Sequence, residues 1–241
     1  MHNIAVILAG GIGSRVGGET PKQLLPLADG RSILEHSIDA FEASPSIDEL
    51  AVVMHPEWLK EAEAICRRNT WHKLTKIIPG GAERWESSYN AIKAFTSSSP
   101  LHEGTGCSIL LHDAARPYVS QRIIADVCQA LETHEAVTVA VPVTDTLYRT
   151  EDNQVQEIPD RKAFMRAQTP QAFHLSTIAE AFQKMVASIS LPLSSPLHRG
   201  TERGIPTDDV AVLKSYSPGT PIFIVPGEET NKKITYPEDI K

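Results

Sequence analysis

Residues 3–27 read NIAVILAGGIGSRVGGETPKQLLPL, an apolar run that passes directly into a glycine-rich segment. The run at 3–9 is continuous rather than alternating, which predicts a strand buried on both faces, and Gly10 and Gly11 end it. Strands of this kind belong to parallel sheets that are covered by helices on each side. The stretch therefore predicts an α/β fold with a glycine-rich loop at the carboxyl end of its first strand.

Outward from this stretch, strand-like and helix-like segments alternate along the chain. Apolar runs of strand length lie at 49–54, 76–79, 108–111, 136–143 and 222–225. Segments that favour helix lie at 32–41, 57–68, 84–95, 120–132, 177–189 and 208–214. The alternation predicts a Rossmann-like, doubly wound, mostly parallel sheet in a single domain that spans residues 1–241.

The alternation breaks at Asp145, where the sequence predicts a protruding β-hairpin arm at 144–160. Thr146–Tyr148 and Val155–Ile158 would be its two strands, and the turn-forming run Glu151-Asp152-Asn153 lies between them. The arm has too few large apolar residues to form a core of its own, so we expect it to pack on a second subunit of a homodimer. A further irregular loop is expected at 190–204.

Composition narrows the classes of function. The chain has 241 residues, about 41% of them hydrophobic, and a formal net charge of −7. An acidic protein of this kind is not expected to bind nucleic acid or a membrane surface, so any anionic ligand requires a local cluster of cations. The three cysteines form no CxxC pair, which argues against a zinc site or a disulfide framework. We expect a cytoplasmic protein, since the start of the sequence shows no targeting segment.

Polar clusters follow several of the predicted strands. They lie at Gly10–Lys22, Gly80–Ser87, His112–Arg116 and Thr144–Thr146. Ligands of doubly wound sheets bind outside the carboxyl ends of the strands. These clusters are therefore the candidates for a binding site.

The glycine-rich loop fits neither of the two common nucleotide motifs. The third glycine of a GxGxxG fingerprint would fall on Val16, which opposes a dinucleotide-binding oxidoreductase. A Walker A loop needs Lys-Ser/Thr after Gly18, where Glu19 and Thr20 stand instead. What remains is a loop whose backbone amides can face phosphate oxygens, with Arg15 and Lys22 as cations for a triphosphate.

Six motifs in order along the chain resemble one family. They are AGGxGxRV…PKQ, GGAERWES, HDAARP, RKAFMRAQTPQ, TDD and NKKITYPED, which begin at residues 9, 80, 112, 161, 207 and 231. Together they resemble the 2-C-methyl-D-erythritol 4-phosphate cytidylyltransferases of the non-mevalonate isoprenoid pathway. The resemblance implies a magnesium-dependent nucleotidyltransferase that joins CMP from CTP to 2-C-methyl-D-erythritol 4-phosphate and releases pyrophosphate.

The resemblance also assigns roles to single residues. It implies a catalytic set of Arg15, Lys22, Asp113 and Lys233. It implies that CTP contacts Ala9, Gly10, Gly11, Gly13, Arg15, Lys22, Gly81, Ala82 and Ser87. It implies that the polyol phosphate contacts Asp113, Arg116, Thr146, Arg161, Thr169 and Lys233. For Ser87 taken alone, a structural role at the start of a helix is equally consistent with the sequence.

The resemblance places Mg²⁺ on Asp113, with Asp208 as a second acidic position. Magnesium prefers oxygen ligands, and one or two carboxylates plus phosphates suffice. Asp208 could instead cap the helix that follows it. His112 is expected to be structural, because no residue near it in the sequence completes a catalytic triad.

Two readings other than this activity remain open. The ribitol-5-phosphate cytidylyltransferases are close relatives that carry out the same reaction on another acceptor, and Ala115 in HDAARP leans toward the erythritol enzymes. A non-catalytic nucleotide-binding protein would also keep the fold, but Arg15, Lys22, Asp113 and Lys233 all argue for an enzyme. The motif NKKIT puts Lys232 beside Lys233, which leaves open which of the two lysines enters the site.

Overall fold

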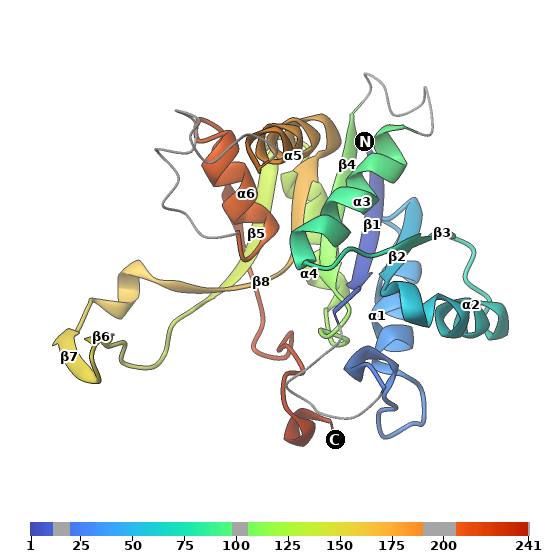
Figure 1. The fold of residues 1–241 in the computed structure, drawn as a ribbon, viewed down its shortest axis with the longest axis horizontal. Helices are drawn as coiled ribbons and strands as arrows, with labels where there is room; N and C mark the ends of the chain where they lie inside the picture. The colour runs from blue at the N-terminus through green and yellow to red at the C-terminus, as the bar shows by residue number, and fades with distance from the viewer. Residues whose placement is uncertain (12–19, 98–105, 190–205, 241) are drawn as a thin grey trace.

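The computed structural model describes residues 1–11, 20–97, 106–189 and 206–240 and is built on a seven-stranded sheet (Figure 1). The strand order is β3-β2-β1-β4-β8-β5-β9. The bounds are β1 His2–Ala9, β2 Glu49–Met54, β3 Leu74–Pro79, β4 Cys107–Asp113, β5 Ala136–Pro142, β8 Met165–His174 and β9 Phe223–Pro226. The mostly parallel α/β sheet predicted from the sequence is confirmed.

Strand β8 was not predicted. It runs antiparallel to both β4 and β5 and lies between them, while the other pairings of the sheet are parallel. Its register against β5 shifts where Thr138 pairs with Gln171 and Val139 with Gln168, so Thr169 and Pro170 form a bulge. A proline and two glutamines do not look like a central strand. They are accommodated because the proline lies in the bulge and the glutamines form hydrogen bonds.

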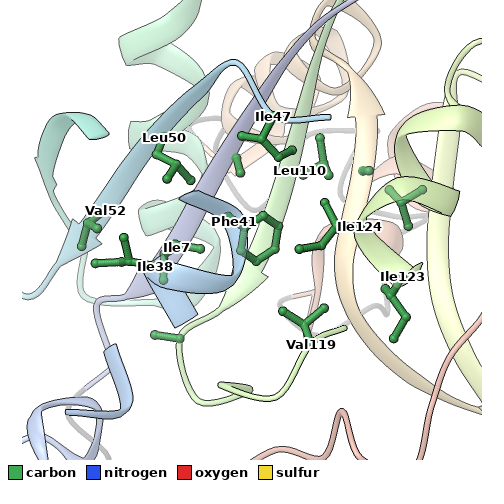
Figure 2. Packing of buried hydrophobic residues seen from close by; sticks show 14 of the residues in the cluster. Ile7, Ile38, Phe41, Ile47, Leu50, Val52, Leu110, Val119, Ile123 and Ile124 are labelled. Carbon is green, nitrogen blue, oxygen red and sulfur yellow. The ribbon is translucent and has the colours of Figure 1, made fainter. Parts of the chain in front are cut away.

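Helices cover both faces of the sheet. One apolar core includes residues of α1 (Ile33–Glu42), α2 (Leu59–Arg68) and α4 (Gln121–Ala130), and the other includes residues of α3 (Arg84–Thr96), α5 (Leu175–Ile189) and α6 (Asp209–Tyr216). Along β1, Ala5 and Ile7 point into the first core while Val6 and Leu8 point into the second, as the period of a strand requires. Figure 2 shows side chains of the first core, with Phe41 of α1 among them.

In the described part of the chain, no helix combines the length and the apolar character needed to cross a membrane.

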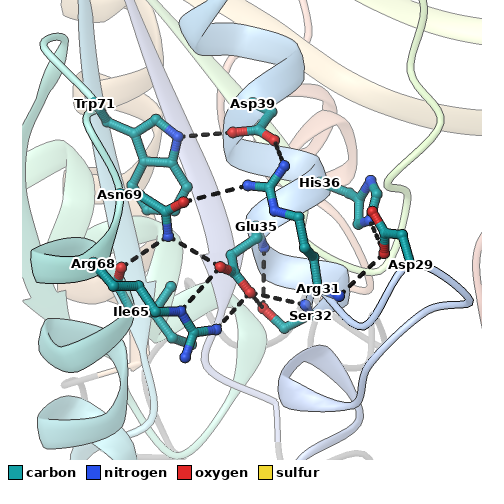
Figure 3. A network of polar contacts seen from close by, with 10 residues as sticks. All are labelled: Asp29, Arg31, Ser32, Glu35, His36, Asp39, Ile65, Arg68, Asn69 and Trp71. Atoms are coloured by element: carbon teal, nitrogen blue, oxygen red, sulfur yellow. Dashed lines mark hydrogen bonds and ion pairs between the residues drawn. The ribbon is translucent and has the colours of Figure 1, made fainter.

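A polar network fixes the start of α1 (Figure 3). Ser32 and Glu35 form a capping box, in which Ser32 caps the helix and Glu35 accepts from the Ser32 backbone N–H at 2.8 Å. Arg68 and Asn69, at the end of α2, donate to the same carboxylate at 2.7 and 3.0 Å. Glu35 is only 2% exposed, and these charged bonds lower its pKa to about 2 against the opposing effect of burial. The network therefore joins α1 to α2 through one ionised carboxylate.

The predicted hairpin extends away from the sheet (Figure 1). Its strands are β6 (Arg149–Glu151) and β7 (Gln154–Glu157), so the first strand begins later than the sequence suggested. Asp152 and Asn153 form the turn with φ of 48° and 61°, the left-handed region that Asp and Asn tolerate best after Gly. All residues of both strands are exposed, so the arm buries no core of its own.

Candidate active site

The site residues collect where β1 and β4 end side by side. Leu8 of β1 is paired with Asp113 of β4, and Ala114 donates its backbone N–H to the Leu8 carbonyl at 3.0 Å. This register puts Gly10 and Gly11, which follow β1, beside the HDAARP turn after β4. Two segments more than 100 residues apart in sequence are therefore neighbours by strand pairing, as the parallel sheet predicts.

Gln23 shapes the start of the glycine-rich loop. Its side-chain amide donates to the carbonyls of Ala9 and Gly11 at 2.5 and 2.9 Å, and the residue is 3% exposed. Its neighbour Lys22 donates from Nζ to the carbonyl of Ile234 at 2.8 Å. Gln23 was not predicted as a site residue, although its position directly after Lys22 in PKQ was a signal. Gly13 and Arg15 lie outside the described residues.

Glycines pack closely around Ser87, a residue predicted to contact the base. A Cβ on Gly10 would lie 2.7 Å from Ser87 Oγ, and a Cβ on Gly80 would lie 3.0 Å from the same atom, so side chains at either position would collide with it. Ser87 is 4% exposed and accepts from the Gly81 N–H at 3.1 Å. It lies in the first turn and a half of α3, whose N-cap is Glu83. The serine therefore packs the loop against β1 rather than capping the helix.

The loop amide next to Gly81 also has a partner. Ala82 donates its N–H to Glu86 Oε2 at 2.6 Å, and the same oxygen accepts from the Glu83 N–H at 3.2 Å. The glutamate and Ser87 thus hold this turn in one conformation. For the backbone amides of this turn to bind a base, they must first give up their hydrogen bonds to Glu86 and Ser87.

Asp113 lies at the centre of a cluster of charged side chains. Lys233 donates from Nζ to its Oδ2 at 2.6 Å, and Arg84 approaches its Oδ1 at 3.4 Å through both Nε and Nη2. Burial alone would raise the pKa of Asp113, which is 9% exposed, but Arg84 and Lys233 hold that pKa well below its usual range. Asp113 is therefore an ionised carboxylate between two cations, and Lys233 is the lysine of NKKIT that enters the site.

Lys232, by contrast, points away from this cluster. Its side chain is 57% exposed and lies 3.7 Å from Asp239. The two neighbouring lysines therefore have different partners, Asp113 for Lys233 and Asp239 for Lys232.

The segment that carries Lys233 is held from several sides. Asn231, which is fully buried, donates to Gln168 Oε1 at 3.2 Å and to the Thr169 carbonyl at 2.9 Å. Arg116 donates to the Asn231 carbonyl at 2.7 Å, and the Ile234 N–H donates to the Ala115 carbonyl at 2.8 Å. The position of the lysine is thus fixed by contacts with β8 and with the HDAARP turn.

Arg116 uses its guanidinium for this support. Besides the Asn231 bond, it donates to the Ala167 carbonyl at 3.3 Å. Burial lowers its pKa, an effect that Asp113 partly opposes. In this conformation Arg116 holds the backbone, and its predicted contact with the substrate stays a prediction.

His112 and Thr169 connect β8 to the Asp113 backbone. His112 Nε2 lies 3.0 Å from the carbonyl oxygen of Arg116. A carbonyl oxygen can only accept a hydrogen bond, so Nε2 carries the proton. Burial lowers the pKa of His112 to about 4, so the ring is neutral and its Nδ1 accepts from the Thr169 hydroxyl at 3.1 Å. The hydroxyl in turn accepts from the Asp113 N–H at 3.1 Å. Thr169 is 5% exposed in this chain of bonds, and His112 has the structural role expected for it.

The two aspartates of the TDD motif have different roles. Asp208 caps α6: its Oδ1 accepts from the Ala211 N–H and its Oδ2 from Gln171 Nε2, both at 2.8 Å. Asp209, which the sequence analysis did not select, is fully buried and lies 2.9 Å from Arg84 Nη2. Within the described residues, no group of three or more His, Cys, Asp or Glu side chains could hold a metal. Binding of a metal by Asp208 stays a prediction, and both of its oxygens already accept hydrogen bonds, Oδ1 from the helix and Oδ2 from Gln171.

Two residues predicted to bind the substrate lie apart from this cluster. Thr146 is exposed, and Arg161, at the base of the arm, donates to the Thr144 carbonyl at 2.6 Å. No hydrogen bond or ion pair among the described residues joins either of them to Asp113 or Lys233. The described residues of the chain therefore bring together only part of the predicted site.

Comparison with known proteins agrees with the motifs. Residues 3–241 match the family model described as IspD: 2-C-methyl-D-erythritol 4-phosphate cytidylyltransferase. The sequence is 42% identical over 241 residues to the 2-C-methyl-D-erythritol 4-phosphate cytidylyltransferase of Thermobifida fusca, covering 98% of this chain and 89% of that protein. A solved structure of 4-diphosphocytidyl-2C-methyl-D-erythritol synthase from Anaerococcus prevotii superposes with a TM-score of 0.78 at 26% identity, covering 99% of this chain and 92% of that one.

A relative with another acceptor is also similar. The bifunctional ribulose 5-phosphate reductase/CDP-ribitol pyrophosphorylase of Haemophilus influenzae is 35% identical over 242 residues, which covers 99% of this chain and 46% of that protein. The similarity is thus shared by proteins named for two different polyols.

Proposed function

The chain belongs to the 2-C-methyl-D-erythritol 4-phosphate cytidylyltransferase family, and from this premise we propose how its residues transfer CMP from CTP to 2-C-methyl-D-erythritol 4-phosphate. The observation that carries the proposal is the cluster in which Lys233 is bonded to Asp113, at the ends of β1 and β4. Lys22 is tied to the residue after Lys233 by its bond to the Ile234 carbonyl. Lys22, near the start of the sequence, is thus held against the segment that carries Lys233, near its end.

The reaction needs orientation and charge stabilisation more than proton transfer. The phosphate oxygen of the acceptor attacks the α-phosphorus of CTP, a new P–O bond forms, and the bond from that phosphorus to the β-phosphate oxygen breaks as pyrophosphate leaves. The nucleophile is already an anion, so no general base is required. The protein must bring two anions together and align the attack opposite the leaving group.

Lys22, Lys233 and Arg15 are the cations proposed for this task. They offset the repulsion between the two substrates and stabilise the charge that builds on the α-phosphate. The fixed positions of Lys22 and Lys233, each bonded to a partner across the site, support this role because preorganised charges lose little energy in reorientation.

Gly81, Ala82 and Ser87 are proposed to read the cytosine, next to the backbone of Ala9, Gly10, Gly11 and Gly13. The absence of side chains at Gly10 and Gly80 leaves the room that Ser87 Oγ occupies beside these two glycines, and Ser87 in turn fixes the Gly81 amide next to which the base is proposed to bind. Backbone amides and one hydroxyl can distinguish the amino edge of cytosine from the carbonyl of uracil.

Asp113 is proposed to orient the polyol hydroxyls and to bind magnesium. It fits the metal because it stays ionised and supplies oxygen ligands, as Mg²⁺ prefers. Since the described residues offer no larger set of metal-binding side chains, phosphate oxygens and water would supply the rest of the coordination. Magnesium bound there would neutralise negative charge on the phosphates.

The acceptor phosphate is proposed to bind Arg161 and Thr146 from a partner subunit, together with Thr169 and Arg116. The arm supports a homodimer because it exposes large apolar side chains without a core of its own, with Tyr148, Val155 and Ile158 52–63% exposed. A second copy that covers the arm would bring those two residues to a site they do not reach within one protomer.

The acceptor itself is tested by comparing two polyol phosphates. The relative from Haemophilus influenzae makes ribitol 5-phosphate the second candidate. We expect kcat/KM for 2-C-methyl-D-erythritol 4-phosphate to exceed that for ribitol 5-phosphate by about 10-fold or more, because an unpaired buried hydroxyl in the wrong substrate is costly. Pyrophosphate release measured with both acceptors decides the matter. A ratio in favour of ribitol 5-phosphate would contradict the erythritol assignment and leave the cytidylyl transfer intact.

A further inference from the structure

Arg84 lies between two carboxylates that belong to different parts of the chain. Its Nη2 is 2.9 Å from Asp209 Oδ2, while its Nε and Nη2 are each 3.4 Å from Asp113 Oδ1. Arg84 is the first residue of α3 and Asp209 the first residue of α6. The guanidinium therefore joins the start of two helices to the carboxylate at the end of β4.

Asp209 has little other support for its charge. The residue is fully buried, and neither of its carboxylate oxygens has a hydrogen-bond partner in good geometry among the described residues. Within that part of the chain, Arg84 is the cation at ion-pair distance from it. A buried carboxylate without a cation is strongly unfavourable. Asp209 therefore attracts the Arg84 guanidinium strongly.

Arg84 lies closer to Asp209 than to Asp113. Its ion pair with Asp209 is 2.9 Å long, whereas its two hydrogen bonds to Asp113 Oδ1 are 3.4 Å long, beyond the roughly 2.7–2.9 Å typical of charged N–H···O⁻ bonds. Lys233 meanwhile occupies the other oxygen of Asp113 at 2.6 Å. Oδ1 of Asp113 is thus the less tightly held oxygen, kept so because Arg84 is drawn toward Asp209.

We propose that Asp209 is a positioning residue which, through Arg84, keeps Oδ1 of Asp113 open to a hydroxyl of the acceptor polyol. This inference rests on the proposed role of Asp113 in orienting the acceptor. In Asp209→Asn the pull on the guanidinium weakens, and Arg84 closes onto Oδ1. The polyol must then displace a charged hydrogen bond before it can bind.

The central experiment is a double-mutant cycle on the KM for the acceptor, at saturating CTP and magnesium. We expect Asp209→Asn to raise the KM for 2-C-methyl-D-erythritol 4-phosphate by about 10-fold or more, with the KM for CTP within about twofold of the wild type. In Arg84→Met/Asp209→Asn no cation can close onto Oδ1, so we expect the acceptor KM to return to within about threefold of the wild type. A role of Asp209 in folding alone would not produce a rise in KM that a second substitution reverses.

Thermal unfolding provides a second, independent readout. Arg84→Met alone leaves the buried Asp209 charge unpaired and is expected to lower Tm by roughly 10 °C, whereas the double variant removes both charges and should recover most of the loss. Asp126→Asn, which removes a carboxylate from the exposed pair with Arg122, is the matched control and should change neither Tm nor the acceptor KM measurably.

The outcomes separate this inference from the proposed function. An unchanged acceptor KM in Asp209→Asn, or no recovery in the double variant, would overturn it. If Asp209→Asn does not fold, the double variant alone decides. An acceptor KM more than about 10-fold above the wild type in that variant would overturn the inference, because Oδ1 would then bind the polyol poorly even with no Arg84 to close onto it. Asp113→Asn tests the underlying role: a normal acceptor KM there refutes the proposed function of Asp113 itself, whereas a raised KM beside a normal Asp209→Asn refutes only the positioning role.

Discussion

Acid should weaken this fold through one carboxylate at the junction of α1 and α2. Glu35 accepts hydrogen bonds from Arg68, Asn69 and Ser32 while almost fully buried, and its pKa is lowered to about 2 from 4.5. The folded state therefore binds its proton less readily than the unfolded chain does. Its contribution to stability is present above pH 4.5 and is lost as the pH falls toward about 2.

The size of the effect follows from the shift in the pKa. At about 1.36 kcal/mol per pKa unit, the lowering corresponds to about 3 kcal/mol of unfolding free energy at neutral pH. Glu35→Gln keeps the shape of the side chain but removes the charge, and it turns an acceptor of the Arg68 bonds into a group with two donors. We expect this variant to lose about 2–3 kcal/mol at pH 7, or roughly 4–12 °C in Tm.

Urea unfolding at several pH values checks the reasoning. The difference between wild type and Glu35→Gln should be largest above pH 5.5 and should shrink as the pH falls toward 3, because protonation removes the charge from the wild type as well. Glu63→Gln, which breaks an exposed ion pair with Arg67 on α2, is the control and should cost less than about 0.5 kcal/mol. A difference that stays constant from pH 7 to pH 3 would refute the assignment to the charge of Glu35.

Three further predictions concern the reaction. Lys22→Ala and Lys233→Ala should each lower kcat by about 10²–10³-fold in a pyrophosphate-release assay while the thermal transition persists, since each removes a fixed cation from the transition state; near-normal turnover would exclude that lysine from the mechanism. CTP should be used far better than UTP, ATP or GTP, and excess chelator should abolish the reaction; comparable turnover of UTP, or full activity with chelator, would contradict the base site or the role of magnesium at Asp113. Ile158→Asp on the arm, where the native side chain is 63% exposed, should give a monomer with reduced activity by light scattering and assay, and an unchanged dimer or a fully active monomer would contradict the shared site.

Much of the fold follows from local sequence patterns, because those patterns report burial directly. The continuous apolar run at 3–9 became a strand whose residues from Asn3 onward are all buried. The Asp152-Asn153 turn became a two-residue hairpin turn, since its backbone conformation depends on those residues themselves. In both cases the physical cause lies within a few residues of the pattern.

Strand β8 could not be predicted in this way, because tertiary hydrogen bonds compensate for its polar residues. Gln168 bonds to the backbone of Glu228 in both directions, and Gln171 bonds to Asp208 and to the N-terminal amides of α6. Each glutamine is at most 5% exposed. Burial of an amide becomes favourable only when distant groups complete its hydrogen bonds, and a sequence window does not contain those groups.

The same limit applied to the candidate site. Family motifs pointed to Asp113, Lys22 and Lys233, whereas Gln23 and Arg84 were missed although both lie inside quoted motifs. Arg84 carried one local signal, since a cation in the first turn of a helix opposes the helix dipole and indicates a carboxylate partner from elsewhere. The identity of that partner could come only from the tertiary arrangement, which brings the first residue of α6 to the first residue of α3.

The charge balance of the cluster shows why an acidic protein can hold cations ready for phosphates. Arg84 and Lys233 are paired with Asp113 and Asp209, so the four side chains are neutral together before any substrate binds. Neutrality keeps the burial of each charge tolerable in the free protein. The carboxylates hold Arg84 and Lys233 in fixed positions, so an anion that binds Lys233 must compete with Asp113 for a cation that is already in place. Local pairing, rather than the net charge of the chain, therefore determines how this site receives an anion.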